Sequence, residues 1–116
     1  VEVSLSKQHL WYYKDGKLIL ETDVVTGMGS NATHKGVFAV TYTEKGSYLT
    51  GEGYKTWVDY WMPFDGGIGL HDASWRNSFG NEIYKTNGSH GCVNMPVDKA
   101  AELFGYLNRG DCVIVY

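Results

Sequence analysis

The chain has 116 residues, which is the size of a single domain with one hydrophobic core. Its net charge of −3 argues against a nucleic-acid partner, because phosphate binding needs a basic surface, and no apolar run approaches the roughly 18 residues of a membrane span. Aromatic residues make up 15% of the chain, and 15 glycines stand against two prolines, so we expect a mainly β domain over residues 1–116.

The first part of the chain predicts strands joined by tight turns. Residues 1–5 alternate between apolar and polar, and the apolar runs 10–14 and 17–21 flank Asp15-Gly16. That dipeptide between two apolar runs indicates a β-hairpin. Further strands are expected at 23–26, as a continuation of the second hairpin strand, and at 36–42.

Residues 54–64 are rich in aromatic side chains, namely Tyr54, Trp57, Tyr60, Trp61 and Phe64. The segment is compatible with a strand pair or with the wall of a cleft. We expect most of these rings to pack in the core. Trp57, Tyr60 and Trp61 also offer flat surfaces that suit a glycan or a peptide.

A single helix is predicted at residues 96–108. Pro96 suits the first helical position, and Arg109-Gly110 follows the last turn as a stop signal. Apolar residues recur along one face at helical spacing, namely Val97, Ala100, Ala101, Phe104 and Leu107. A helix N-terminus directed at the nearby Cys92 would favour a thiolate there, which is a hypothesis that the sequence alone does not test.

The stretch from Ser89 to Asn94 carries the most informative chemistry. Cys92 follows a glycine, so another backbone can approach the thiol closely. Ser89, His90 and Asn94 supply hydrogen-bonding groups within a few residues of it. A cysteine in such surroundings is a candidate nucleophile, with backbone N–H groups nearby to stabilise developing negative charge.

His71 is the candidate base among the four histidines. It ends the run 66–70, which predicts a short buried strand, and a rigid strand can hold a general base in position. Asp72 follows, and its side chain or backbone can fix the imidazole tautomer. In contrast, His9 is expected on a solvent-facing strand position and His34 in a mobile loop.

Two structural alternatives remain open for the cysteines. Cys92 and Cys112 could form a disulfide, although Cys112 lies in a β-branched terminal strand where it is most simply a core residue. A zinc site from His71, His90, Cys92 and Asp72 is the other possibility, but it lacks the closely spaced ligand pairs of structural zinc. We expect neither a metal nor a cofactor.

The order His71-Asp72, then Ser89-His90-Gly91-Cys92-Val93-Asn94, resembles the L,D-transpeptidases that cross-link bacterial peptidoglycan. The resemblance extends to Val25-Thr26-Gly27 and Gly36-Val37-Phe38, so it covers roughly the whole chain. Two departures stand out. Thr33-His34-Lys35 replaces a frequent Thr-Pro, and Asp72 replaces a frequent Gly or Ser, which leaves the third member of the triad open.

The resemblance implies a β-sandwich-like fold of mixed sheets with one helix after the catalytic cysteine. It also implies cysteine acyl transfer from a tetrapeptide stem, with release of D-Ala, to a side-chain amine of a neighbouring stem, giving a 3→3 cross-link. Carbapenem β-lactams would acylate the same cysteine. We expect a monomeric catalytic domain acting outside the cytoplasm at the cell wall, as the C-terminal part of a longer exported or membrane-anchored protein.

Roles for the remaining site residues follow as expectations. Backbone N–H groups of Cys92, His90 and Gly91 are the expected oxyanion donors, with His90 and Ser89 supporting the loop. Trp75 and Arg76 lie in the polar stretch 72–81, expected at the rim of the cleft. Arg76 could bind the terminal carboxylate of D-Ala, and Asn94 could orient His71 or peptide amides. Another cell-wall cysteine peptidase and a non-catalytic wall-binding module are the alternative functions.

Overall fold

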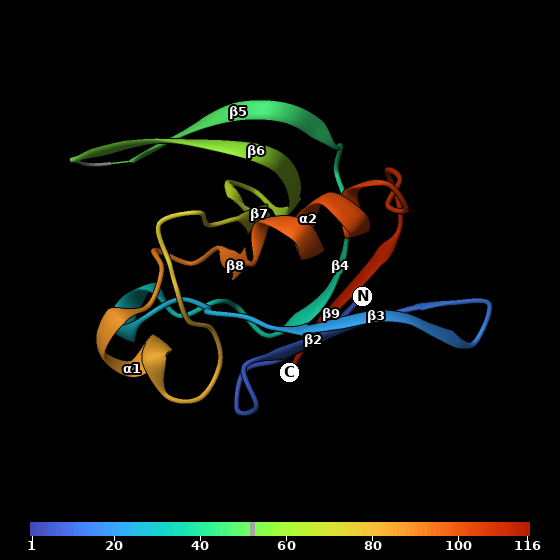
Figure 1. Ribbon diagram of the computed structural model, residues 1–116, viewed down its shortest axis with the longest axis horizontal. Helices are drawn as coiled ribbons and strands as arrows, with labels where there is room; N and C mark the ends of the chain where they lie inside the picture. Colours follow the sequence, from blue (N-terminus) through green and yellow to red (C-terminus); the bar gives the residue numbers. More distant parts are fainter. Residues whose placement is uncertain (52) are drawn as a thin grey trace.

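A computed structural model of the protein describes residues 1–51 and 53–116, and its strands form two mixed sheets (Figure 1). The five-stranded sheet has the order β3-β2-β1-β9-β4 and contains β1 (Glu2–Ser4), β2 (His9–Lys14), β3 (Lys17–Asp23), β4 (Gly36–Ala39) and β9 (Cys112–Val115). The four-stranded sheet has the order β5-β6-β7-β8 and contains β5 (Glu44–Gly51), β6 (Tyr54–Asp65), β7 (Ile68–Asp72) and β8 (Val93–Met95). The expected mainly β fold is confirmed.

Helix α2 (Val97–Phe104) lies between the two sheets, where it contacts β6 and β7 of one and β3 of the other (Figure 1). Its Ala100 and Leu103 are fully buried in a core that both sheets share. The helix predicted after the cysteine is therefore present but shorter than expected. It ends at Phe104 because the Gly105 N–H turns back onto the carbonyls of Ala101 and Glu102.

The predicted hairpin joins β2 and β3. Asp15 and Gly16 both have positive φ, at 51° and 79°, as a type I′ turn requires. The expected continuation of β3 through residues 23–26 is wrong, because β3 ends at Asp23. Val25 instead forms an isolated bridge with Asn94, which connects the end of the first sheet to β8.

The aromatic segment is one long strand, β6, and not a strand pair. It pairs with β5 on one side and β7 on the other. Strand β5, helix α1 (Ile83–Asn87) and the 3₁₀ turn η1 (Gly29–Asn31) were not expected from the sequence. The β5 segment is polar and contains two glycines, so its strand conformation follows from pairing with β6.

The expectation that Cys112 is a core residue is wrong. Cys112 is the first residue of β9 and is exposed, whereas Val113 and Val115 are buried. Successive side chains of a strand point to opposite faces, so the burial of Val113 turns Cys112 outward.

The parallel pairing of β7 with β8 sets the geometry of the site. Leu70 lies opposite Val93, and His71 lies opposite Asn94. This register places the end of β7 beside the residues that follow Cys92. On the other side of β7, Gly69 permits the close pairing with β6, because a Cβ there would lie 2.5 Å from the Cα of Pro63. Within residues 1–51 and 53–116, no helix has the length and apolar character needed to cross a membrane.

Candidate active site

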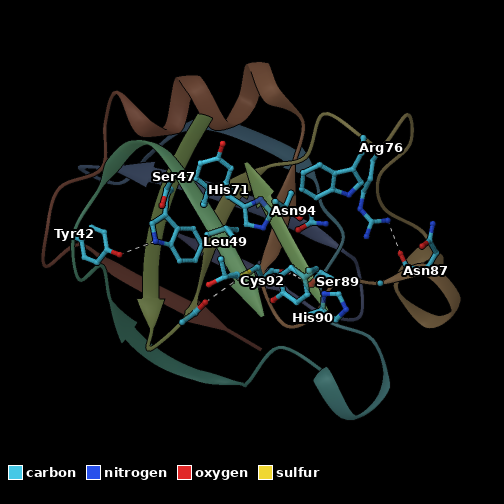
Figure 2. Close-up of a pocket in the computed structure, with 18 residues that line it drawn as sticks. Tyr42, Ser47, Leu49, His71, Arg76, Asn87, Ser89, His90, Cys92 and Asn94 are labelled. Carbon is cyan, nitrogen blue, oxygen red and sulfur yellow. Dashed lines mark hydrogen bonds between the residues drawn. The ribbon is translucent and has the colours of Figure 1, made fainter. Parts of the chain in front are cut away.

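A cleft of about 450 Å³ opens beneath the β5–β6 hairpin, and both His71 and Cys92 line it (Figure 2). The hairpin contributes Ser47, Leu49, Tyr54 and Thr56 to its wall, and the loop before β8 contributes Ser89 and His90. The two residues predicted to carry the chemistry, separated by twenty-one positions in the sequence, thus face one cavity.

Cys92 is a half-buried free thiol in the loop between α1 and β8. Its Sγ lies 3.8 Å from the carbonyl oxygen of Gly67. Burial raises the pKa of the thiol to about 11, and a hydrogen bond with the Gly69 backbone opposes this by less. Strand β8 lies between Cys92 and α2 in the chain, and the hypothesis that the helix N-terminus favours the thiolate stays a prediction.

His71 is buried at the end of β7, with 3% of its surface exposed. Its Nδ1 lies 2.6 Å from the carbonyl oxygen of Asp72, so Nδ1–H is the donor and Nε2 is left as an acceptor. Burial is the main cause that lowers the pKa of His71. The two pKa shifts thus favour the uncharged forms of both groups, a neutral imidazole and a protonated thiol.

The carboxylate of Asp72 is turned away from His71. It accepts hydrogen bonds from the backbone N–H groups of Asp59 and Tyr60, at 2.8–3.1 Å. The pairing of β6 with β7 ends at Trp61 and His71, and the Asp72 side chain binds the next two amides of β6. The group that holds the His71 tautomer is thus the backbone carbonyl of Asp72, which any residue type supplies.

Asn94 lies between His71 and Arg76. With its oxygen turned to Arg76, Asn94 Oδ1 accepts from Nε at 2.9 Å and from Nη2 at 3.3 Å, and its Nδ2 donates to His71 Nε2 at 3.2 Å. This orientation gives the amide oxygen two donors and the amide nitrogen an acceptor, whereas the opposite one would place like groups together. Arg76 Nη1 also donates to the carbonyl oxygen of Asn87 at 2.7 Å (Figure 2).

The loop before β8 is held by its own side chains. Ser89 Oγ donates to the Cys92 carbonyl and accepts from the Gly91 N–H at 3.1 Å. The His90 ring stacks on Tyr54 of β6, with centroids 4.5 Å apart and planes 7° apart. Gly91 has φ +128°, and a Cβ there would lie 2.6 Å from Ile68 Cδ1.

Two further residues hold this loop and were not singled out individually from the sequence. Thr33 Oγ1 donates to the Gly91 carbonyl at 2.6 Å and accepts from the Gly27 N–H at 3.0 Å. A Cβ on Gly27 would lie 1.9 Å from the Asn31 carbonyl oxygen. The resemblance includes Val25-Thr26-Gly27 and the segment Thr33-His34-Lys35, but it assigns neither of them a task.

Aromatic rings border His71 on two sides. The rings of Trp61 and Trp75 each have their centroid 6.0 Å from that of His71. Trp61 is buried, and its Nε1 donates to the hydroxyl of Tyr42 at 3.1 Å. Trp75 is half exposed and lines the cleft, as expected of a rim residue.

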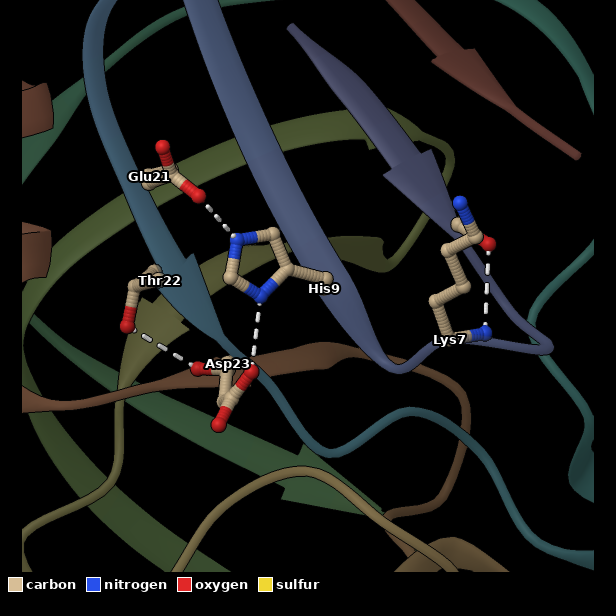
Figure 3. A network of polar contacts seen from close by, with 6 residues as sticks. Lys7, His9, Glu21, Thr22 and Asp23 are labelled. Atoms are coloured by element: carbon tan, nitrogen blue, oxygen red, sulfur yellow. Dashed lines mark hydrogen bonds and ion pairs between the residues drawn. The ribbon is translucent and has the colours of Figure 1, made fainter.

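His9 and His34 lie outside the cleft. His9, on β2, contacts Asp23 through Nδ1 at 2.7 Å and Glu21 through Nε2 at 2.9 Å (Figure 3). The imidazole thus joins two carboxylates across the hairpin. His34 contacts Asp65 at 2.9 Å.

The two structural alternatives for the cysteines find no support. Cys92 and Cys112 are both free thiols. Across residues 1–51 and 53–116, no three His, Cys, Asp or Glu side chains gather closely enough to hold a metal ion.

Comparison with protein families matches residues 1–115 to YkuD, the L,D-transpeptidase catalytic domain. Curated protein sequences gave no match. Among solved structures, that of a cysteine-to-serine mutant of the Enterococcus faecium L,D-transpeptidase superposes with a TM-score of 0.96 at 45% identity, over 99% of this chain and 48% of that one.

Two more solved L,D-transpeptidase structures are similar to this chain. The catalytic domain of the Enterococcus faecium enzyme acylated by ertapenem has a TM-score of 0.89 and 46% identity, over 99% of this chain and 94% of that one. An L,D-transpeptidase from Stackebrandtia nassauensis has a TM-score of 0.84 and 36% identity, over 99% and 53%. The chain therefore spans about half the length of two of these three relatives.

Proposed function

Because the chain belongs to the YkuD family of L,D-transpeptidase catalytic domains, we propose that it cross-links peptidoglycan stems by acyl transfer through Cys92. The observation that carries the proposal is that the Cys92 thiol and the buried His71 line the same cleft. A non-catalytic wall-binding module would need neither group.

In the first step, His71 Nε2 takes the proton from the Cys92 thiol while Sγ attacks a carbonyl carbon of the donor stem. The donor is a tetrapeptide stem, and the carbonyl is that of its third residue. The tetrahedral intermediate collapses when His71 returns the proton to the amine of the terminal D-Ala. The C–N bond breaks, D-Ala leaves, and a thioester remains on Cys92.

The oxyanion of that intermediate needs N–H donors in the cysteine loop. The Gly91 N–H is already donated to Ser89 Oγ, so we propose the Cys92 N–H as the first donor. In other enzymes the loss of one such donor costs about 3 kcal/mol of transition-state stabilisation. Ser89 and Thr33 serve this step by holding the loop in place.

In the second step, a side-chain amine of a neighbouring stem attacks the thioester. His71 accepts the amine proton and returns it to the sulfur, which restores the thiol and yields a 3→3 cross-link. Water in place of the amine would give a free carboxylate, which is the product of a hydrolytic peptidase. Because the proposed substrates are peptidoglycan stems, we place the proposed reaction outside the cytoplasm, at the cell wall.

Carbapenem β-lactams are the inhibitors that the same chemistry implies. The related Enterococcus faecium catalytic domain is acylated by ertapenem. We propose that Cys92 opens the β-lactam ring by the same attack on a carbonyl, beside the exposed face of Trp75.

The experiment is incubation of the protein with a disaccharide-tetrapeptide at neutral pH, followed by mass spectrometry. Cys92→Ala is the test variant, and Cys112→Ala is the matched control, because Cys112 is exposed on the other sheet. We expect release of D-Ala and a stem dimer with the parent and with Cys112→Ala, and neither product with Cys92→Ala.

Other outcomes have definite meanings. Release of D-Ala without a dimer would replace the transferase by a hydrolase. An unreactive, folded protein with a free Cys92 thiol would contradict the proposal and favour a binding module.

A further inference from the structure

Arg76 is fixed between two carbonyl acceptors of the protein. Nη1 donates to the Asn87 backbone, while Nε and Nη2 both donate to Asn94 Oδ1. An amide oxygen can accept two N–H groups, whereas the amide nitrogen would bring donor against donor. The guanidinium therefore determines which end of the Asn94 amide faces His71.

Asn94 is buried, with 2% of its surface exposed, so its amide depends on partners within the protein. Its Nδ2 donates to His71 Nε2, and on the far side of the ring Nδ1–H donates to the Asp72 carbonyl. One ring nitrogen is thus a donor and the other an acceptor. Only the neutral imidazole satisfies both contacts, because a second N–H would oppose the Asn94 NH₂ group.

The charged groups that act on the pKa of His71 are Asp72 and Arg76. The other titratable groups that line the same cleft are the Cys92 thiol, His90, Tyr42, Tyr48 and Tyr54. The Asp72 carboxylate is turned to the amides of Asp59 and Tyr60. The other neighbours of the ring are the uncharged indoles of Trp61 and Trp75. Arg76 is the cation of this group, and it acts on His71 by charge and through Asn94.

We propose that Arg76 is a positioning residue for the base: through the Asn94 amide it holds His71 neutral, in one tautomer and one orientation, until Cys92 transfers its proton. In that transfer the S–H bond breaks, an Nε2–H bond forms, and the Asn94 N–H gives up its contact with Nε2. The inference rests on the proposed function only in that it takes His71 as the base. This role differs from the expectation that Arg76 binds the terminal carboxylate of D-Ala, because three of the five guanidinium N–H groups already donate to protein acceptors.

The test is the NMR titration of the His71 imidazole in a Cys92→Ala background, which removes the coupled titration of the thiol. Arg76→Met removes both the charge and the paired Nε and Nη2 donors. Arg76→Lys keeps the charge but cannot make the two-point contact to Asn94 Oδ1. We expect both variants to move the His71 midpoint upward by about one pH unit, the effect of losing one hydrogen bond to the neutral form. Arg109→Met is the matched control and leaves the midpoint unchanged.

A double-mutant cycle with Asn94→Ala separates the contact from the charge. The effect of Arg76→Lys should vanish once Asn94 is absent. A wild-type midpoint in Arg76→Lys would overturn the proposal and leave Arg76 acting by charge alone. An undiminished shift in the double variant would also overturn it, because Arg76 would then act on His71 without Asn94.

Turnover of the tetrapeptide distinguishes the two proposals, because the titration needs no substrate. If the parent makes no stem dimer while the shifts occur, the proposed function fails and the positioning role stands. If the dimer forms and the shifts are absent, only the positioning role fails.

Discussion

At the scale of single residues, burial favours the neutral forms of the Cys92 thiol and the His71 imidazole. Burial raises the pKa of Cys92 and lowers that of His71, so each shift disfavours the charged form. A thiolate–imidazolium pair would require the opposite shifts. In the proposed mechanism, the attack of Cys92 therefore requires a proton transfer from the thiol to His71.

The raised pKa of the Cys92 thiol gives a prediction for its reactivity. In a Cys112→Ala variant, the rate of alkylation by iodoacetamide should rise through the alkaline range, because the thiol pKa is raised to about 11 and only the thiolate reacts. The rate is followed from pH 6 upward by mass spectrometry, with circular dichroism confirming the fold. In the Cys92→Ala variant, the exposed Cys112 provides the reference. A plateau already reached at neutral pH would contradict the prediction and indicate an ion pair.

At the scale of elements, the cysteine loop is held from three directions. Ser89 closes the loop on itself, Tyr54 of the β5–β6 hairpin stacks on His90, and Thr33 joins the loop to the segment after β3. Most of these contacts involve backbone atoms of the loop. The position of Cys92 thus depends on residues distributed over most of the chain.

Thr33→Val tests the contact between the cysteine loop and the segment that joins β3 to β4. The change conserves the shape of the side chain but removes the hydroxyl, leaving the Gly27 N–H and the Gly91 carbonyl without a buried partner. We expect a loss of about 2 kcal/mol in the free energy of unfolding, measured with urea, and faster amide exchange at Gly91. Thr33→Ser retains the hydroxyl and serves as the control. Equal stability of the valine and serine variants would show that the bridge contributes nothing.

At the scale of the whole molecule, two sheets and one helix share a single core. Leu10 of the first sheet, Leu70 of the second and Leu103 of α2 are all fully buried in it. His71 directly follows Leu70, so the residue that packs in the core also holds the strand that carries the proposed base. Stability and site geometry are therefore coupled at β7.

Leu70→Ala measures this coupling. Removal of a fully buried leucine side chain should cost about 2–5 kcal/mol in the free energy of unfolding. Leu18→Ala, at a position 46% exposed, should change it by less than about 0.5 kcal/mol. Urea denaturation of both variants gives the comparison. Similar losses for the two positions would contradict a core shared at β7.

Local signals in the sequence were sufficient for part of the fold. The Asp15-Gly16 hairpin follows from turn chemistry, and α2 follows from the spacing of apolar residues. Both depend on neighbours within a few positions. Strand β5 could not be predicted in this way, because its polar residues become a strand only against β6. Cys112 was assigned to the core because its run is apolar, yet strand alternation places it outside.

The sequence by itself determined which residue types are available for the chemistry, namely a thiol after glycine and a histidine at the end of a strand. Tertiary structure decided how they are used. The pairing of β7 with β8 joins His71 to Asn94, the Asp72 backbone and not its carboxylate holds the imidazole, and Arg76 binds Asn94. These contacts join positions up to about twenty residues apart, and burial then sets their protonation. Neither distance nor burial is encoded in local spacing, because both arise only when the two sheets close on a common core.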